Sequence, residues 1–150
     1  MKYNKIRRGS VNQNDLSRWV GQRKYCTQLS EQEKDGLFKR LKEIDGWGIT
    51  GHTLKRIGSK GIEVTYDDIV SAIHNSDIVE YKIDKNNRLG TYEERVVLSS
   101  KAIVNRCYRF KAVYSLTEKK IITVWINHID DNHDTLDWSL YNENMKVFNI

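Results

Sequence analysis

The segment RCYRFKAVYSLTEKKIITVWINHI, residues 106–129, decides the fold class because apolar and polar residues alternate along both of its halves. Alternation of this kind places successive side chains on opposite faces of a β-strand. We therefore expect strands over 106–116 and 120–129, joined by a tight connection at TEKK. The residues expected on the core face are Tyr108, Phe110, Ala112 and Tyr114 in the first strand and Ile122, Val124 and Ile126 in the second.

Two further strands are expected upstream, at IVEYKI (78–83) and ERVVLSS (94–100), with a turn between them. Before residue 75 the apolar period becomes helical. Ser30 and Glu33 have the spacing of a capping box, which predicts a helix beginning there. The other helices are expected over 14–24, 52–59 and 65–74.

This order of elements predicts an α+β fold with N-terminal helices packed on a four-stranded, mainly antiparallel sheet. We expect a single domain over 1–150, made of a helical N-terminal extension (1–48), a helix-plus-sheet core (50–129) and an acidic tail (130–150).

Composition favours a globular, polar chain, since 39% of the residues are hydrophobic and 30% are charged. The first 60 residues hold 14 Lys and Arg against 6 Asp and Glu, a net charge of +8, and the remainder carries −3. A basic half favours a polyanionic partner, although simple solubility explains it equally well. The sequence holds no apolar run near the roughly 20 residues of a membrane span, so we expect no membrane partner and a cytoplasmic protein, in the host cytosol if it is phage-encoded.

The polar face of the last two expected strands carries side chains suited to nucleic acid. If Val124 and Ile126 point inward, Thr123, Trp125 and Asn127 point outward together. The preceding strand exposes Arg109, Lys111 and Ser115 by the same rule. Such a face can hold phosphates by charge and stack a base on Trp125. The alternative is an ordinary solvated face with Trp125 covered by the tail.

The stretch GHTLKRIGSKGI, residues 51–62, places His52 and Arg56 on one side of an expected helix. A neutral histidine can take a proton from a ribose hydroxyl near pH 7, and a fixed arginine can neutralise a phosphate as charge builds. Lys55 and Lys60 add positive charge nearby. The commoner explanation of such a pair is a histidine at a helix start beside a surface arginine.

HTLKRIGSKGI, TYDDIVSAI, IVEYK, ERVVLSS and IITVW, which span roughly residues 50–127, together resemble a group of small phage and bacterial domains. Those domains are similar to the barnase–colicin–RelE ribonuclease fold, which includes toxin-like, metal-independent endoribonucleases. The resemblance implies catalytic roles for His52, Arg56 and Thr123. Lys60 stands where this group has an arginine, which suits a phosphate contact but not a bidentate one.

Two functions of different kinds follow from these patterns. The first is RNA binding or RNA hydrolysis to a 2′,3′-cyclic phosphate, with His52 as general acid or base, and with an inhibitor or immunity protein as a further partner. Substrate binding falls to Lys55, Lys60, Arg109, Lys111 and Trp125. The second is a non-enzymatic phage protein that binds a host or virion protein. A DNA-binding helix-turn-helix is disfavoured, because Asp67 and Asp68 would repel phosphate.

No cofactor is expected. Phosphate-binding loops, dinucleotide-binding motifs and zinc-protease motifs are missing from the sequence. The segment HIDDNHD (128–134) matches no established metal-ligand spacing, and Cys26 and Cys107 fit no metal site either.

Overall fold

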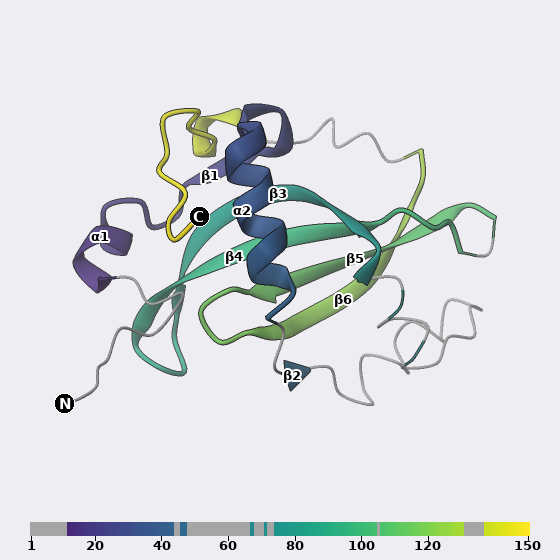
Figure 1. Cartoon of the computed structure of the whole chain (residues 1–150), viewed down its shortest axis with the longest axis horizontal. Helices are drawn as coiled ribbons and strands as arrows, with labels where there is room; N and C mark the ends of the chain where they lie inside the picture. Colours follow the sequence, from purple (N-terminus) through teal and green to yellow (C-terminus); the bar gives the residue numbers. More distant parts are fainter. Residues whose placement is uncertain are drawn as a thin grey trace.

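In the computed structural model, the described residues are 12–43, 46–47, 67, 71, 74–104, 106–130 and 137–150. Four long antiparallel strands dominate the fold and occur where the sequence predicts them, so the α+β class is confirmed (Figure 1). They are β3 (Ser76–Asn86), β4 (Thr91–Ser100), β5 (Tyr108–Ser115) and β6 (Lys120–His128).

Two short strands that the sequence did not reveal extend the sheet at its edges. The strand order is β1-β3-β4-β5-β6-β2. β1 (Arg23–Tyr25) pairs antiparallel with β3, so the antiparallel part has five strands, whereas the two-residue β2 (Gly46–Trp47) runs parallel to β6. Neither strand is long enough to show an alternating pattern of its own, and each exists through its pairing with a longer neighbour.

A β-bulge in β6 corrects one of the predicted core positions. Val113 pairs with Thr123 and Tyr114 pairs with Ile121, so Ile122 is the extra residue between the two pairs. Ile121 is therefore fully buried, while Ile122, predicted to face the core, is half-buried. Beyond the bulge the prediction holds, because Val124 and Ile126 are both buried.

Helix α2 (Glu31–Leu41) crosses the core face of the sheet (Figure 1). Its capping box forms as predicted: Ser30 Oγ accepts from the Glu33 amide, and the Glu33 carboxylate accepts from the Ser30 amide. Arg40 on this helix donates to both carboxylate oxygens of Glu94 on β4, at 2.7 and 3.0 Å. Since Glu94 is fully buried, this bidentate pair fixes the helix against the sheet.

The predicted helix over 14–24 is much shorter in the structure. Helix α1 (Gln13–Ser17) is capped by Asn12, whose side chain accepts from the Asn14 amide. The chain then turns at Gly21, whose φ of +80° favours glycine, and enters β1. The prediction over-extended the helix because Leu16, Trp19 and Val20 have helical spacing, whereas pairing with β3 makes the following residues a strand.

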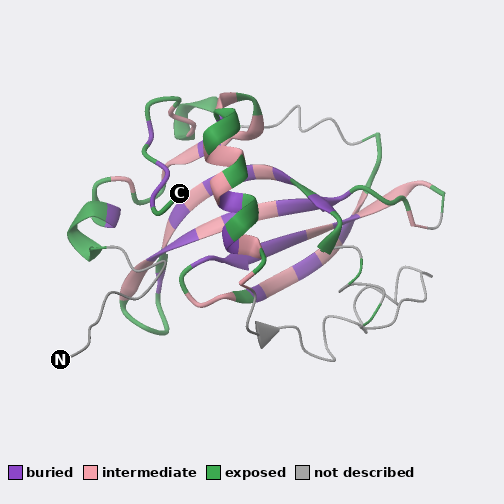
Figure 2. Cartoon of the chain, viewed as in Figure 1, coloured by how far each residue is buried: buried purple, intermediate pink, exposed green. Residues whose placement is uncertain are grey.

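The C-terminal segment packs back on the body. Met145, Val147 and Phe148 are buried, and Figure 2 shows the buried positions running along the strands and α2 beside this segment. The last residue, Ile150, approaches Gly36 of α2 so closely that a Cβ at that glycine would clash with it. Gly36 therefore allows the chain end to lie against the helix.

Candidate functional site

The structure brings together the sheet residues that the sequence singled out. On β5 and β6, Arg109 pairs with Asn127, and Lys111 pairs with Trp125. Thr123 lies two positions along β6 from Trp125 and therefore on the same face. These side chains are half-buried, while the intervening Ala112 and Val124 are buried on the opposite, helix-bearing face. We call the face formed by Arg109, Lys111, Thr123, Trp125 and Asn127 the β5–β6 face.

The helical half of the predicted site is not placed. His52, Lys55, Arg56 and Lys60 lie outside the described residues, as do Gly61, Thr65 and His133. Of the helix expected over 65–74, the described residues Asp67, Ser71 and His74 are helical and exposed.

The two cations of the β5–β6 face are held differently. Lys111 Nζ donates to Ser99 Oγ on β4 at 3.1 Å, and Ser99 is itself buried. Arg109 Nε is buried as well, but no acceptor among the described residues takes its hydrogen. A buried donor of this kind costs free energy unless it meets an acceptor.

Ser115 departs from the prediction that it is exposed beside Arg109 and Lys111. Its side chain is fully buried, and its hydroxyl donates to Glu93 Oε2 at 3.0 Å. The same hydroxyl accepts from the Glu118 amide in the turn after β5. Ser115 therefore anchors the turn between β5 and β6, and its hydroxyl is not exposed to a ligand.

At the Ser115 end of the same face, cations are neutralised by carboxylates. Arg23 on β1 donates to Glu80 on β3 at 2.9 Å. Arg95 on β4 pairs with Glu93 and, at 3.5 Å, with Asp84. Such pairs neutralise these two arginines locally.

The carboxylate of Glu80 is also bound by a tyrosine that the sequence did not connect with it. Tyr141 Oη in the C-terminal segment donates to Glu80 Oε1 at 2.6 Å. Partial burial, reinforced by this hydrogen bond and by the negative charge of Glu80, raises the pKa of Tyr141 to about 12. The hydroxyl therefore remains a donor at neutral pH and fixes the segment to β3.

The described buried carboxylates are all engaged in holding the fold. Glu80 accepts from Arg23 and Tyr141, while Glu94 accepts from Arg40 and Tyr81. Glu93 accepts from Arg95, Asn86 and Ser115. These three buried carboxylates therefore serve the fold and do not act as a base at the β5–β6 face.

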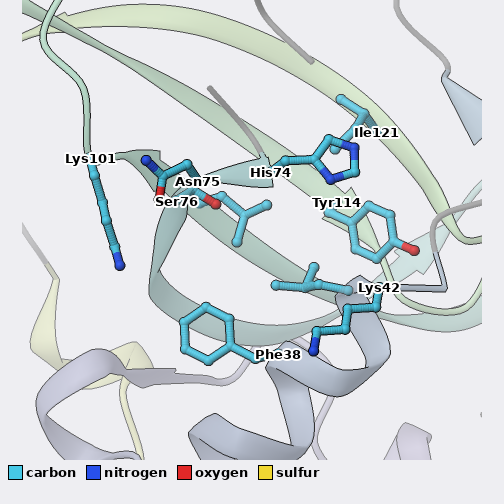
Figure 3. A pocket seen from close by; sticks show the side chains of 10 residues that line it. Phe38, Lys42, His74, Asn75, Ser76, Lys101, Tyr114 and Ile121 are labelled. Carbon is cyan, nitrogen blue, oxygen red and sulfur yellow. The ribbon is translucent and has the colours of Figure 1, made fainter. Parts of the chain in front are cut away.

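A cavity of about 240 Å³, which sequence reasoning missed, lies on the helix-bearing face (Figure 3). Its walls come from the end of α2, from β3 to β6, and from the residues just before β3 and just after β4. No local pattern pointed to it, because its residues are separated by up to some 80 positions and meet only in the folded chain. The lining residues are Phe38, Leu41, Lys42, His74, Asn75, Ser76, Leu98, Lys101, Tyr114 and Ile121.

Comparison with family models, with curated proteins and with solved structures found no match for the chain. In the described part of the chain, His, Cys, Asp and Glu form no group of three that could hold a metal ion. None of the helices described is long and apolar enough to cross a membrane.

Proposed function

We propose that the protein binds single-stranded RNA on the β5–β6 face. The observation that carries this proposal is the Lys111–Trp125 pair, with Arg109 on the same face one pair further along. An indole can stack a base of any identity, and neighbouring cations can neutralise the phosphates on either side of it. A base held inside a duplex is not available for such stacking, which is why the single strand is the favoured form.

The spacing of the cations supports an extended backbone. Arg109 and Lys111 are two positions apart on β5, which corresponds to about 7 Å along the strand. Two cations at this separation can contact neighbouring phosphates, while the Asn127 amide supplies donors and acceptors for a base edge or a ribose. Sequence preference is expected to be weak, because charge and stacking dominate the contacts.

We further propose that this surface belongs to a ribonuclease, with the cleaving groups supplied by His52 and Arg56. In the proposed reaction His52 takes the proton of the ribose 2′-hydroxyl, whose oxygen attacks phosphorus and displaces the 5′-oxygen. The leaving 5′-oxygen takes up a proton from water, and a 2′,3′-cyclic phosphate remains. Arg56 stabilises the charge that develops on the phosphate, with Lys55 and Lys60 nearby, and Thr123 orients a phosphate oxygen or the 2′-hydroxyl.

RNA binding is tested by fluorescence anisotropy with a short fluorescein-labelled single-stranded RNA and with the same strand annealed to its complement. We expect tighter binding of the single strand, and we expect Trp125→Ala to weaken that binding by roughly tenfold or more. Trp138→Ala is the matched control, because Trp138 is 55% exposed and lies in the C-terminal segment. Equal binding of both RNA forms, or equal losses in the two variants, would contradict the proposal.

Cleavage is tested separately by inducible expression, with the wild type beside His52→Ala. Discrete fragments of total RNA on a denaturing gel, present only with the wild type, support catalysis by His52. Intact RNA in both cultures, together with single-strand binding in the anisotropy experiment, leaves an RNA-binding protein without nuclease activity.

The second candidate function, a protein-binding module, is favoured by the exposed apolar side chains of the C-terminal segment. Trp138 and Leu140 are 55% and 40% exposed, and Trp138 contacts the rings of Tyr25 and Tyr141. Exposed aromatic side chains held rigidly in this way are typical anchors of protein interfaces. This alternative predicts normal growth and intact RNA on expression, and a host or virion protein whose binding is lost in Trp138→Ala and retained in Trp125→Ala.

A further inference from the structure

The cavity on the helix-bearing face has an apolar interior. Leu98 and Ile121 line it from the sheet, and Phe38 lines it from α2. Figure 3 shows Phe38 and Ile121 on opposite sides of the cavity. Leu98 and Ile121 are buried, whereas Phe38 is 36% exposed and stands at the entrance. Small-molecule sites commonly combine such an apolar interior with a few polar groups at the rim.

The rim of the cavity carries basic side chains from three separate segments. Lys42 follows α2, His74 precedes β3, and Lys101 follows β4. No Asp or Glu is among the lining residues that the structure describes. The nearest described carboxylate partner of Lys101 is Asp77, at 3.8 Å, and both side chains of this pair are more than half exposed. An exposed pair of this length is weak and can yield to a ligand anion.

From the apolar interior and the basic rim, we propose that this cavity binds a small planar aromatic anion, with its rings against Phe38, Leu98 and Ile121 and its charged group between Lys42 and Lys101. A volume of about 240 Å³ exceeds the roughly 150 Å³ of a cavity that holds benzene, and so has room for a two-ring compound. The anionic group is a carboxylate, sulfonate or phosphate, since each meets the same cations.

This site is distinct from the β5–β6 face. Leu98, Tyr114 and Ile121 point to the side of the sheet that carries α2, whereas Ser99, Lys111 and Trp125 point to the other side. Changes at the cavity rim should therefore leave RNA binding unaltered. The two proposals can fail independently of each other.

The test uses two fluorescent compounds that share their rings and differ in charge. The first is 1-anilinonaphthalene-8-sulfonate, and the second is the uncharged N-phenyl-1-naphthylamine. We expect the sulfonate to bind the folded, full-length protein at one saturable site, about tenfold more tightly than the uncharged compound, because the two lysines contribute only to the charged one. Equal affinities, or several weak sites for the sulfonate, would overturn the proposal.

Variants locate the binding to the cavity. Lys42→Gln and Lys101→Gln should each weaken sulfonate binding about threefold while leaving the uncharged compound unaffected. Lys39→Gln is the matched control. Lys39 lies in the last turn of α2, close to the C-cap residue Lys42, but it does not line the cavity. Phe38→Ala should weaken the binding of both compounds. Sulfonate binding that is unchanged in both Lys42→Gln and Lys101→Gln, or that Lys39→Gln lowers equally, would refute the assignment. Circular dichroism checks that each variant is folded.

Discussion

Arg95 and Arg109 lie on the same face of the sheet, at opposite ends, and their surroundings differ. Arg95 pairs with Glu93 and Asp84, and Glu93 is only 1% exposed. Arg109 pairs with the amide residue Asn127 across the strands, and among the described residues no carboxylate lies in ion-pair range of its guanidinium. The first arginine is part of the structure's own charge balance, and the second has no such carboxylate partner among the described residues.

This difference shows why a count of basic residues does not locate a polyanion site. The strands carry lysines and arginines along the whole face, but those of β1, β3 and β4 are matched by Glu80, Asp84 and Glu93. Only the arrangement in space separates a charge that stabilises the fold from one that is left to attract phosphate.

Removing the negative charge of Glu93, which pairs with Arg95, should lower the free energy of unfolding more than the other changes considered. In Glu93→Gln, the acceptor of Arg95, Asn86 and Ser115 loses its charge inside the protein. We expect the free energy of unfolding to fall by roughly 3 kcal/mol, because Arg95 is left with only the longer contact to Asp84. Urea titration measures this, with the exposed Glu31→Gln as control, expected within about 0.5 kcal/mol of the wild type.

Trp125→Ala should have the largest effect on RNA affinity. Loss of a stacking ring costs about 1–3 kcal/mol per base, so we expect single-strand affinity to fall by roughly tenfold or more. Trp125→Phe should recover part of the loss, because a smaller ring still stacks. If Trp125→Ala binds RNA as the wild type does, then the indole is covered in solution and the β5–β6 face is an ordinary solvated surface.

Removing the charge of each arginine in turn tests whether Arg109 contacts RNA while Arg95 only stabilises the fold. Arg109→Gln should weaken single-stranded RNA binding by about 1 kcal/mol and reduce the salt dependence of log Kd by roughly 0.7, the value for one lost phosphate contact. Arg95→Gln should leave both quantities unchanged and lower the free energy of unfolding instead. The same salt slope in both variants would mean that the two arginines do not differ in the way their surroundings suggest.

Much of the sheet could be predicted because its strands alternate clearly. The exception at β6 has a physical cause: Ile121 and Ile122 are both apolar, so the sequence fits either register, and only the bulge decides which one is buried. β1 could not be predicted for a different reason. Its central residue Lys24 is buried, and its ammonium group binds the Glu33 carboxylate and the Met145 carbonyl oxygen, partners that no local pattern connects with it.

The candidate site shows the same limit. Arg109, Lys111, Thr123 and Trp125 could be grouped from strand alternation alone, because alternation is local and the two strands are joined by a short turn. Which of the cations on that side of the sheet would be neutralised could not be predicted, since Arg23 and Glu80, for example, are 57 positions apart. The cavity residues were missed for the same reason. The catalytic roles of His52 and Arg56 stay predictions.

The smallest expected effect concerns the tyrosine bound to Glu80 and appears only at alkaline pH. A tyrosine in the unfolded chain ionises near pH 10, whereas burial and Glu80 raise the pKa of Tyr141 to about 12 in the folded protein. The folded state therefore keeps a proton that the unfolded state releases. The stability contribution of Tyr141 is fully present below about pH 10 and is lost as the pH rises toward about 12.

Tyr141→Phe should remove this contribution and make the alkaline decline in stability shallower than in the wild type. The remaining decline is expected to include Tyr81, because its burial and the adjacent Glu94 raise the pKa of Tyr81 as well. Urea midpoints measured across the alkaline range give the slope, with Tyr92→Phe as the matched change elsewhere on the sheet. Parallel curves for the wild type and Tyr141→Phe would mean that the C-terminal segment leaves Glu80 before the protein unfolds, which would detach the exposed Trp138 from the carboxylate-paired end of the sheet.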